Sequence, residues 1–134
     1  MPIKVLLTIL SFCFFFAQAQ EVDSLQNSFK LKIQSAENDS IRVSNMIDYG
    51  EYLINHHFIQ SESIVKEGLK IVKEEGLHEK LKALLLVELG IINRRKGRYN
   101  ESIENYLHAL NIFEKLSDQE NTADVYHNLS LIHI

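Results

Sequence analysis

Apolar and small residues recur along the chain at the spacing of an α-helix, which has about 3.6 residues per turn. One such stripe starts at Phe58 and proceeds in steps of 3, 4, 3, 1 and 3 residues, and the same five steps start again at Tyr99, 41 residues later. Identical stripes on two segments indicate that one helix has been copied. The copied positions are Phe58, Ser61, Val65, Gly68, Leu69 and Val72, matched by Tyr99, Ser102, Tyr106, Ala109, Leu110 and Phe113.

The segments in front of these two helices are copies as well. They match at an offset of 40 residues, and a third copy begins at the same interval further along the chain. A two-helix unit of this size cannot bury its own apolar stripe, so each unit has to stack on a neighbour. The sequence therefore predicts an all-α fold of stacked antiparallel helical hairpins. The matched positions are Met46, Tyr49 and Gly50 with Leu86, Leu89 and Gly90, and Ala83, Leu86 and Leu89 with Ala123, Tyr126 and Leu129.

Small and large residues of the stripes have different expected places. The small ones suit the points where two helices come closest, and the aromatic ones suit the space between hairpins, where full burial contributes about 1.5–3 kcal/mol each. The small residues are Gly50, Gly90, Ser61, Gly68, Ser102 and Ala109, and the aromatic ones are Tyr99, Tyr106 and Phe113.

Capping residues and glycines predict the helix boundaries. Asp39 or Ser40 suits the N-cap of a helix that ends near Asn55, and Gly76 suits the C-terminal stop of the next helix. Gly97 marks the tight turn inside the second hairpin. The expected organisation is a lead-in helix over residues 20–38, a first repeat over 39–77, a second over 78–117, and the truncated start of a third over 118–134, which Asp118 opens. The lead-in helix would place Val22, Leu25, Phe29 and Ile33 on one face.

The chain resembles the tetratricopeptide repeat family over roughly residues 40–130, and the signature is carried by the second repeat. Two features differ from the usual pattern: the period is 40–41 residues where the common form has about 34, and His56-His57 replaces the turn glycine in the first repeat. This long form is similar to the extracytoplasmic repeats of bacterial membrane sensor kinases and membrane-tethered transcription regulators. The resemblance implies a right-handed α-solenoid that binds proteins or peptides. It rests on Leu86-x-x-Leu89-Gly90 followed by Gly97-x-Tyr99-x-x-Ser102-x-x-x-Tyr106-x-x-Ala109-Leu110.

The resemblance also implies a binding groove. In tetratricopeptide folds the first helix of each pair lines a concave surface, and an apolar strip that ends in arginines suits a peptide carrying an acidic group. Repeats that grip C-terminal carboxylates need asparagines where Glu88 and Ile91 stand here, so that class of partner is not expected. The expected groove residues are Ile47, Glu51, Ile54, Leu84, Val87, Ile91, Arg94 and Arg95.

A basic cluster ends the first helix of the second repeat. It consists of residues 94–96 and Arg98. One interpretation is that these cations interact favourably with the C-terminal end of the helix dipole. The functional alternative is an anion-binding edge of the groove.

The first nineteen residues have the three parts of a secretory signal peptide. Lys4 supplies a positive charge, residues 5–16 are almost wholly apolar, and small residues suit cleavage between Ala19 and Gln20. The apolar run is shorter than the roughly 20 residues of a membrane-spanning helix, so an uncleaved anchor is the less favoured alternative. We expect a secreted, periplasmic or cell-envelope protein with no membrane span apart from the signal peptide.

Composition excludes several kinds of chemistry. The single cysteine, Cys13, lies in the predicted signal peptide, and Phe12 before it is too large for a lipoprotein cleavage site. Without that segment the chain has no thiol, which excludes disulfides, thiolate metal sites and cysteine nucleophiles. The formal net charge of −4, with both signs interspersed, is not typical of nucleic-acid binding.

Catalytic and metal-binding patterns are not recognisable in the sequence. His56 and His57 are adjacent, and neighbours on a helix point about 100° apart, so they suit a solvated turn better than a metal site. We find no serine in a strand–turn–helix elbow and no glycine-rich loop. The sequence therefore predicts a binding protein, not an enzyme, with no cofactor and no metal.

The last residues form an apolar segment without a cap. The predicted third repeat leaves Val125, Tyr126 and Leu129 without the second helix that would cover them, which favours self-association through this end. We also hypothesise that residues 129–134 are encoded by a sequencing adaptor and not by the gene. The alternative is a native repeat, because Leu129 and Ser130 are in register with Leu89 and Gly90.

Overall fold

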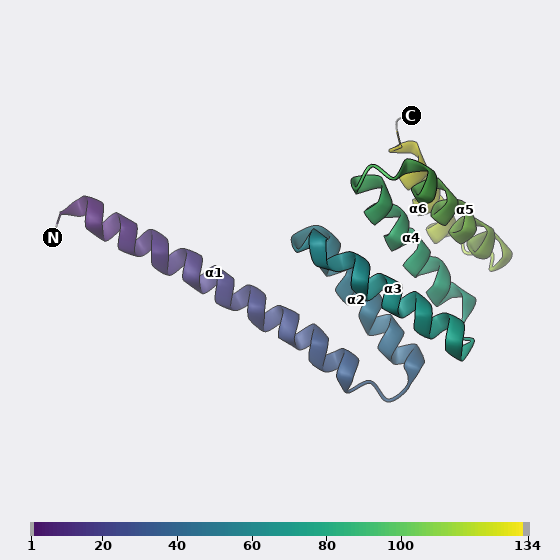
Figure 1. Cartoon of the computed structure of the whole chain (residues 1–134), viewed down its shortest axis with the longest axis horizontal. Helices are drawn as coiled ribbons and strands as arrows, with labels where there is room; N and C mark the ends of the chain where they lie inside the picture. Colours follow the sequence, from purple (N-terminus) through teal and green to yellow (C-terminus); the bar gives the residue numbers. More distant parts are fainter. Residues whose placement is uncertain (1, 133–134) are drawn as a thin grey trace.

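The computed structural model describes residues 2–132, apart from the side chains of Val22 and Asp23. Over these residues the chain is helical and has no strand, which confirms the predicted fold class. Figure 1 shows a stack of helical hairpins from which α1 projects. The helices are α1 (Ile3–Gln34), α2 (Asp39–His56), α3 (Phe58–Glu75), α4 (Glu79–Arg95), α5 (Tyr99–Lys115) and α6 (Gln119–Ser130).

Two hairpins form the centre of the stack. Helix α2 packs against α3, and α4 packs against α5, while α3 and α4 join the hairpins and α6 covers part of α5. The two stripes are buried at most of the predicted positions, which confirms the repeat. Phe58 and Leu69 are half-buried. Tyr99 is 44% exposed, because it is the first residue of α5 and lies next to the turn. The buried stripe residues are Ser61, Val65, Gly68 and Val72 on α3, and Ser102, Tyr106, Ala109, Leu110 and Phe113 on α5.

The N-cap of α2 is Asn38, so the expected cap at Asp39 or Ser40 was wrong by one or two residues. Asn38 has an extended backbone and its side chain accepts a hydrogen bond of 2.9 Å from the backbone N–H of Ile41, whereas Asp39 is already helical. This is the usual geometry of an asparagine cap.

The other predicted boundaries agree with the structure. Gly76 ends α3 and Gly97 follows α4, with positive φ angles of 60° and 75°, in the left-handed region that glycine adopts without steric cost. Asp118 caps α6 by accepting a hydrogen bond of 3.2 Å from the backbone N–H of Asn121.

The small residues lie where the helices approach each other, as expected. A Cβ at Gly90 would be 2.4 Å from the Tyr106 ring, and one at Gly50 would be 2.6 Å from a carboxylate oxygen of Glu88. Ser102, which replaces the usual alanine, donates a buried hydrogen bond of 2.7 Å to the carbonyl oxygen of Gly90. Gly90 therefore lets α4 lie close to α5, and Gly50 lets α2 lie close to α4.

The described side chains of α1 that contact the stack lie in its C-terminal part. The Phe29 ring lies 5.3 Å from the rings of Tyr49 and Tyr52, and the Asn45 side chain donates a hydrogen bond of 3.0 Å to the carbonyl oxygen of Lys32. Leu25 was expected on the packing face but is 45% exposed. The side chain of Val22, expected on the same face, lies outside the described residues.

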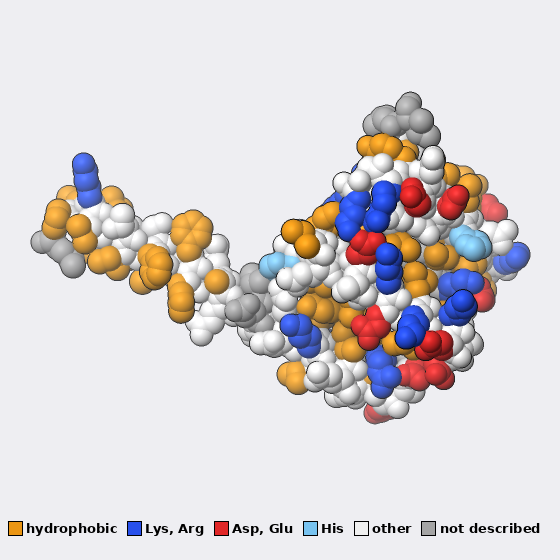
Figure 2. Space-filling model, in the orientation of Figure 1, with side chains coloured by type: hydrophobic (Ala, Val, Ile, Leu, Met, Phe, Trp, Pro, Cys, Tyr) orange, Lys and Arg blue, Asp and Glu red, His pale blue; other side chains and the backbone are white. Residues whose placement is uncertain are grey.

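The N-terminal half of α1 is apolar and exposed. Figure 2 shows hydrophobic side chains along this projecting part, whereas charged side chains of both signs are mixed over the stack. The helix is continuous from Ile3, so no break separates the expected signal peptide from the lead-in helix. Its length and apolar composition would suffice to cross a membrane, and a signal sequence near an N-terminus has the same properties.

Helix α6 is partly covered by the second repeat. Val125 is fully buried in the cluster that α4 and α5 form, contrary to the expectation that it would be uncovered, while Tyr126 is 54% exposed. The difference arises because α6 packs against α5 along the face that carries Val125. The final predicted segment, 129–134, is described only as far as Ile132, and His133 lies outside the described residues.

Candidate binding groove

The first helices of the repeats, α2, α4 and α6, line a cavity of about 390 Å³. All eight residues that the sequence placed in a groove lie along its wall. Ile54 is more buried than expected, with 4% exposure, because it packs into the core of the first hairpin. Sequence reasoning missed the rest of the lining, which consists of Asn55, Glu88, Asn121, Asp124, His127 and Asn128.

Glu88 forms the buried acidic part of this cavity. It is 7% exposed, and its Oε2 atom has no hydrogen-bond partner among the described residues. Burial is the main reason that the pKa of the Glu88 carboxyl is raised to about 9, and the charges of Glu51 and Asp48 on α2 contribute to this rise. Glu88 is therefore protonated at neutral pH. The apolar residues next to Glu88 in the sequence do not indicate that it is buried and protonated. In the sequence, Glu88 was noted only because it stands where repeats that bind C-terminal carboxylates need an asparagine.

The two groove arginines have different surroundings. Arg95 donates a hydrogen bond of 2.5 Å to the carbonyl oxygen of Ile54, and its guanidinium lies 5.6 Å from the centre of the Phe58 ring. Arg94 is half-buried, and its Nε atom has no partner among the described residues. Arg95 thus ties α4 to the first hairpin, and Arg94 lines the cavity next to Tyr106 of α5.

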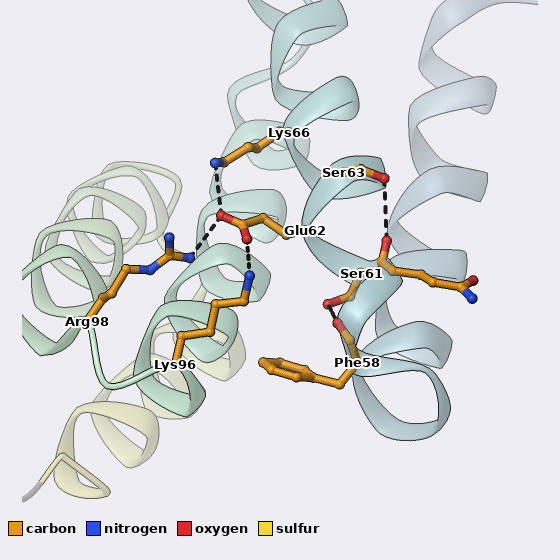
Figure 3. Close-up of polar contacts among 8 residues, drawn as sticks. Phe58, Ser61, Glu62, Ser63, Lys66, Lys96 and Arg98 are labelled. Carbon is orange, nitrogen blue, oxygen red and sulfur yellow. Dashed lines mark hydrogen bonds and ion pairs between the residues drawn. The ribbon is translucent and has the colours of Figure 1, made fainter.

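The rest of the basic cluster joins the two repeats. Figure 3 shows the Glu62 carboxylate between Lys66, Lys96 and Arg98, with N–O distances of 2.9 Å to Lys66 and to Arg98. The hydrogen bond from Lys96 is the main reason that the pKa of Glu62 is lowered to about 2, with Lys66 and Arg98 contributing. Glu62 on α3 therefore anchors the turn between α4 and α5. Neither alternative considered for this cluster included such a role, because the sequence does not show which acid a basic run meets.

This anchor predicts a pH dependence of stability. The folded pKa of Glu62, about 2, is below its ordinary value of 4.5, so its contribution is present above pH 4.5 and is lost as the pH falls towards 2. When the pH is lowered from 5 to 3, the Glu62→Gln variant should lose about 1 kcal/mol less unfolding free energy than the wild type loses. Urea unfolding at both pH values measures this difference. Glu101→Gln, at an exposed position of α5, is the matched control, and equal effects of the two variants would contradict the assignment.

A second cavity, of about 810 Å³, lies at the other end of the same helices. Leu84 lines both cavities, so the two cavities adjoin at this residue. Lys80 at the start of α4 pairs with Asp118 at 2.8 Å, and this hydrogen bond is the main reason that the pKa of Asp118 is lowered to about 2. The sequence did not predict this cavity. Its remaining lining includes Ser40, Ile41, Ser44, His78, Leu81 and Leu116.

The two adjacent histidines lie at the turn between α2 and α3, as expected. The His56 ring stacks on Tyr52 with centroids 4.7 Å apart, and the His57 ring lies 6.1 Å from the same tyrosine. Within residues 2–132 no group of three or more potential metal-ligating side chains comes together.

Comparison with known proteins agrees with this geometry. The tetratricopeptide repeat family model matches residues 81–134, which include α4, α5 and α6. No curated protein and no solved structure gives a significant match to the chain. The match covers the second hairpin, and the first hairpin repeats its stripe of buried and small residues. The region of the chain from residue 81 onward therefore belongs to the tetratricopeptide repeat family.

Proposed function

We propose that the chain is a binding scaffold that holds a peptide segment of another protein in the groove of α2, α4 and α6. Tetratricopeptide repeats generally mediate protein–protein interactions, which supports the general function. The observation that carries the specific site is the cavity of about 390 Å³, which apolar residues line together with Glu88 and Arg94. Each of these two residues has a buried polar atom without a partner among the described residues. Cavities of this composition are typical ligand sites.

A selection experiment with groove variants tests this proposal. Peptides are selected from a random 12-residue phage library against the purified chain, synthesised, and measured by calorimetry. Val87→Asp places a charge on the apolar wall and should weaken binding by at least about tenfold, since it buries an unpaired carboxylate against the ligand. His108→Asp, at an exposed position of α5, should have no effect. Selected peptides that bind equally to both variants would refute the groove as the site.

We further propose that the protein acts in the cell envelope or outside the cell, after cleavage between Ala19 and Gln20. The charged start, the apolar run and the small residues before Gln20 support this proposal. The mass of the exported product after expression in a bacterial host measures it directly. The expected N-terminus is Gln20, and an intact N-terminus on all of the protein would contradict cleavage.

The alternative function is that of a sensory ectodomain of a membrane-bound histidine kinase or transcription regulator. The signal-like segment followed by repeats of 40–41 residues favours this alternative, through the resemblance described above. Coding DNA downstream of this region distinguishes the two. A transmembrane segment followed by a kinase or DNA-binding frame supports a sensor, and further repeats followed by a stop codon support a free scaffold.

A further inference from the structure

We propose that Glu88 makes the groove specific for a ligand that inserts a lysine or arginine side chain, which pairs with the Glu88 carboxylate. This inference rests on the proposed peptide-binding function and adds the chemistry of the ligand. Glu88 lies at the floor of the groove, between α2 and α4.

The position of the Glu88 carboxyl supports this proposal. Gly50 on α2 leaves the space that Oε2 of Glu88 occupies, since a Cβ there would be 2.6 Å from that oxygen and 3.1 Å from Val65. Glu88 is more than nine-tenths buried and also lines the cavity, yet its buried Oε2 atom has no hydrogen-bond partner within residues 2–132. A buried polar atom without a partner is costly, and its retention in a cavity wall is typical of groups that bind ligands.

The charges around Glu88 also favour a basic ligand. Helix α2 contributes two carboxylates whose charges act on Glu88, and α6 contributes a carboxylate and a histidine to the same cavity, while α3 presents the apolar Val65. On α5, Tyr106 packs against Gly90 two residues from Glu88. Acids near a buried acid favour a cation between them. Asp48 on α2 acts on Glu88 through its charge. The titratable groups that line the cavity with Glu88 are Glu51 on α2, Asp124 and His127 on α6, and Arg94 and Arg95 on α4.

The arginines of α4 do not supply this cation. Arg94 and Arg95 are six and seven residues from Glu88, which corresponds to about 9–10 Å along the helix axis, and Arg95 donates to the carbonyl oxygen of Ile54. The cation must therefore come from the ligand. A ligand with an acidic group about three extended residues from its basic side chain would reach both Glu88 and Arg94.

Binding of a cation would release the proton that Glu88 carries at neutral pH. The pKa of the free carboxyl is about 9, and pairing with an ammonium or guanidinium group lowers it. Affinity for a basic ligand should then rise about tenfold per pH unit between pH 6 and pH 8, with release of about one proton per ligand. A neutral ligand would show neither effect.

Calorimetry on the full chain with defined peptides tests the inference. The probes are seven blocked heptapeptides of leucine and alanine with one lysine moved through the seven positions, and the same series with norleucine in place of lysine. We expect at least one lysine peptide to bind at least about tenfold more tightly than its norleucine match at pH 8. Measurements in two buffers of different ionisation enthalpy should show release of about one proton.

Two variants identify the carboxyl that is responsible. Glu88→Gln should remove the lysine preference and the proton release while the norleucine peptides bind as before. Glu67→Gln, at an exposed position of α3, should change nothing. Equal binding of the lysine and norleucine peptides, or a lysine preference that survives in Glu88→Gln, overturns the role of Glu88 but leaves the groove as the site. Failure of every peptide to bind the wild type overturns the inference together with the proposed function.

Discussion

Replacing Tyr106 with alanine should lower the free energy of unfolding by about 3–5 kcal/mol, the usual cost of deleting an aromatic side chain from a core. Tyr106 is fully buried and belongs to the cluster that joins α4, α5 and α6. Its ring also packs directly against Gly90, where an added Cβ would be only 2.4 Å from the ring. Such a loss is a large share of a domain's total stability.

Urea unfolding at pH 7 measures this effect, and Glu104→Ala is its control. Glu104 lies two residues away on the same helix and is exposed, so its removal should change the unfolding free energy by less than about 0.5 kcal/mol. Equal effects at the two positions would show that the buried face of α5 has been wrongly identified.

Replacing Glu88 with glutamine should raise the free energy of unfolding at pH 8 by about 2–4 kcal/mol. The folded pKa of Glu88 is about 9 and its ordinary value is 4.5, so above pH 4.5 the folded state holds a proton that the unfolded state releases. The wild type therefore loses stability as the pH rises from 4.5 towards 9. Glutamine keeps the shape and cannot ionise, so this loss disappears.

Unfolding free energies at pH 4 and pH 8 give the measurement. The stabilisation by Glu88→Gln should be small at pH 4 and full at pH 8, the opposite trend from that expected of Glu62→Gln, which acts below pH 4.5. Glu67→Gln is the control at an exposed position. A stabilisation independent of pH would contradict a protonated Glu88. A residue that reduces stability at neutral pH and lines a cavity is typical of a site kept for binding.

Sequence periodicity predicted the helices because they depend on local pattern, and the family resemblance then placed the groove on the first helix of each repeat. The stripe from Ser102 to Phe113 specifies which face of α5 is buried, and the repeat offset specifies that α2 and α4 occupy equivalent places. The outward positions of these two helices then follow from helical geometry, which is why residues such as Val87 were placed correctly on the cavity wall. Their role in ligand binding stays a prediction.

Other features depend on contacts between helices that no local pattern encodes. The burial of Glu88 follows from the space at Gly50, 38 positions earlier, and the role of Lys96 follows from its meeting with Glu62, 34 positions earlier. The lining from α6 was missed because the sequence analysis treated the third copy as an incomplete repeat. Tyr99 was misplaced because periodicity does not show where a helix end leaves the core.

Mapping of a bound peptide by ¹⁵N–¹H NMR tests the central claim, that the concave surface of α2, α4 and α6 is the binding site. A peptide obtained by phage selection is titrated into the labelled chain, and shifts of the backbone amide signals are followed residue by residue. We expect the largest shifts of amide signals at residues of the cavity wall, including Ile47, Val87 and Asp124. Changes concentrated instead on the exposed positions of α3 and α5, such as Glu67 and His108, would contradict it.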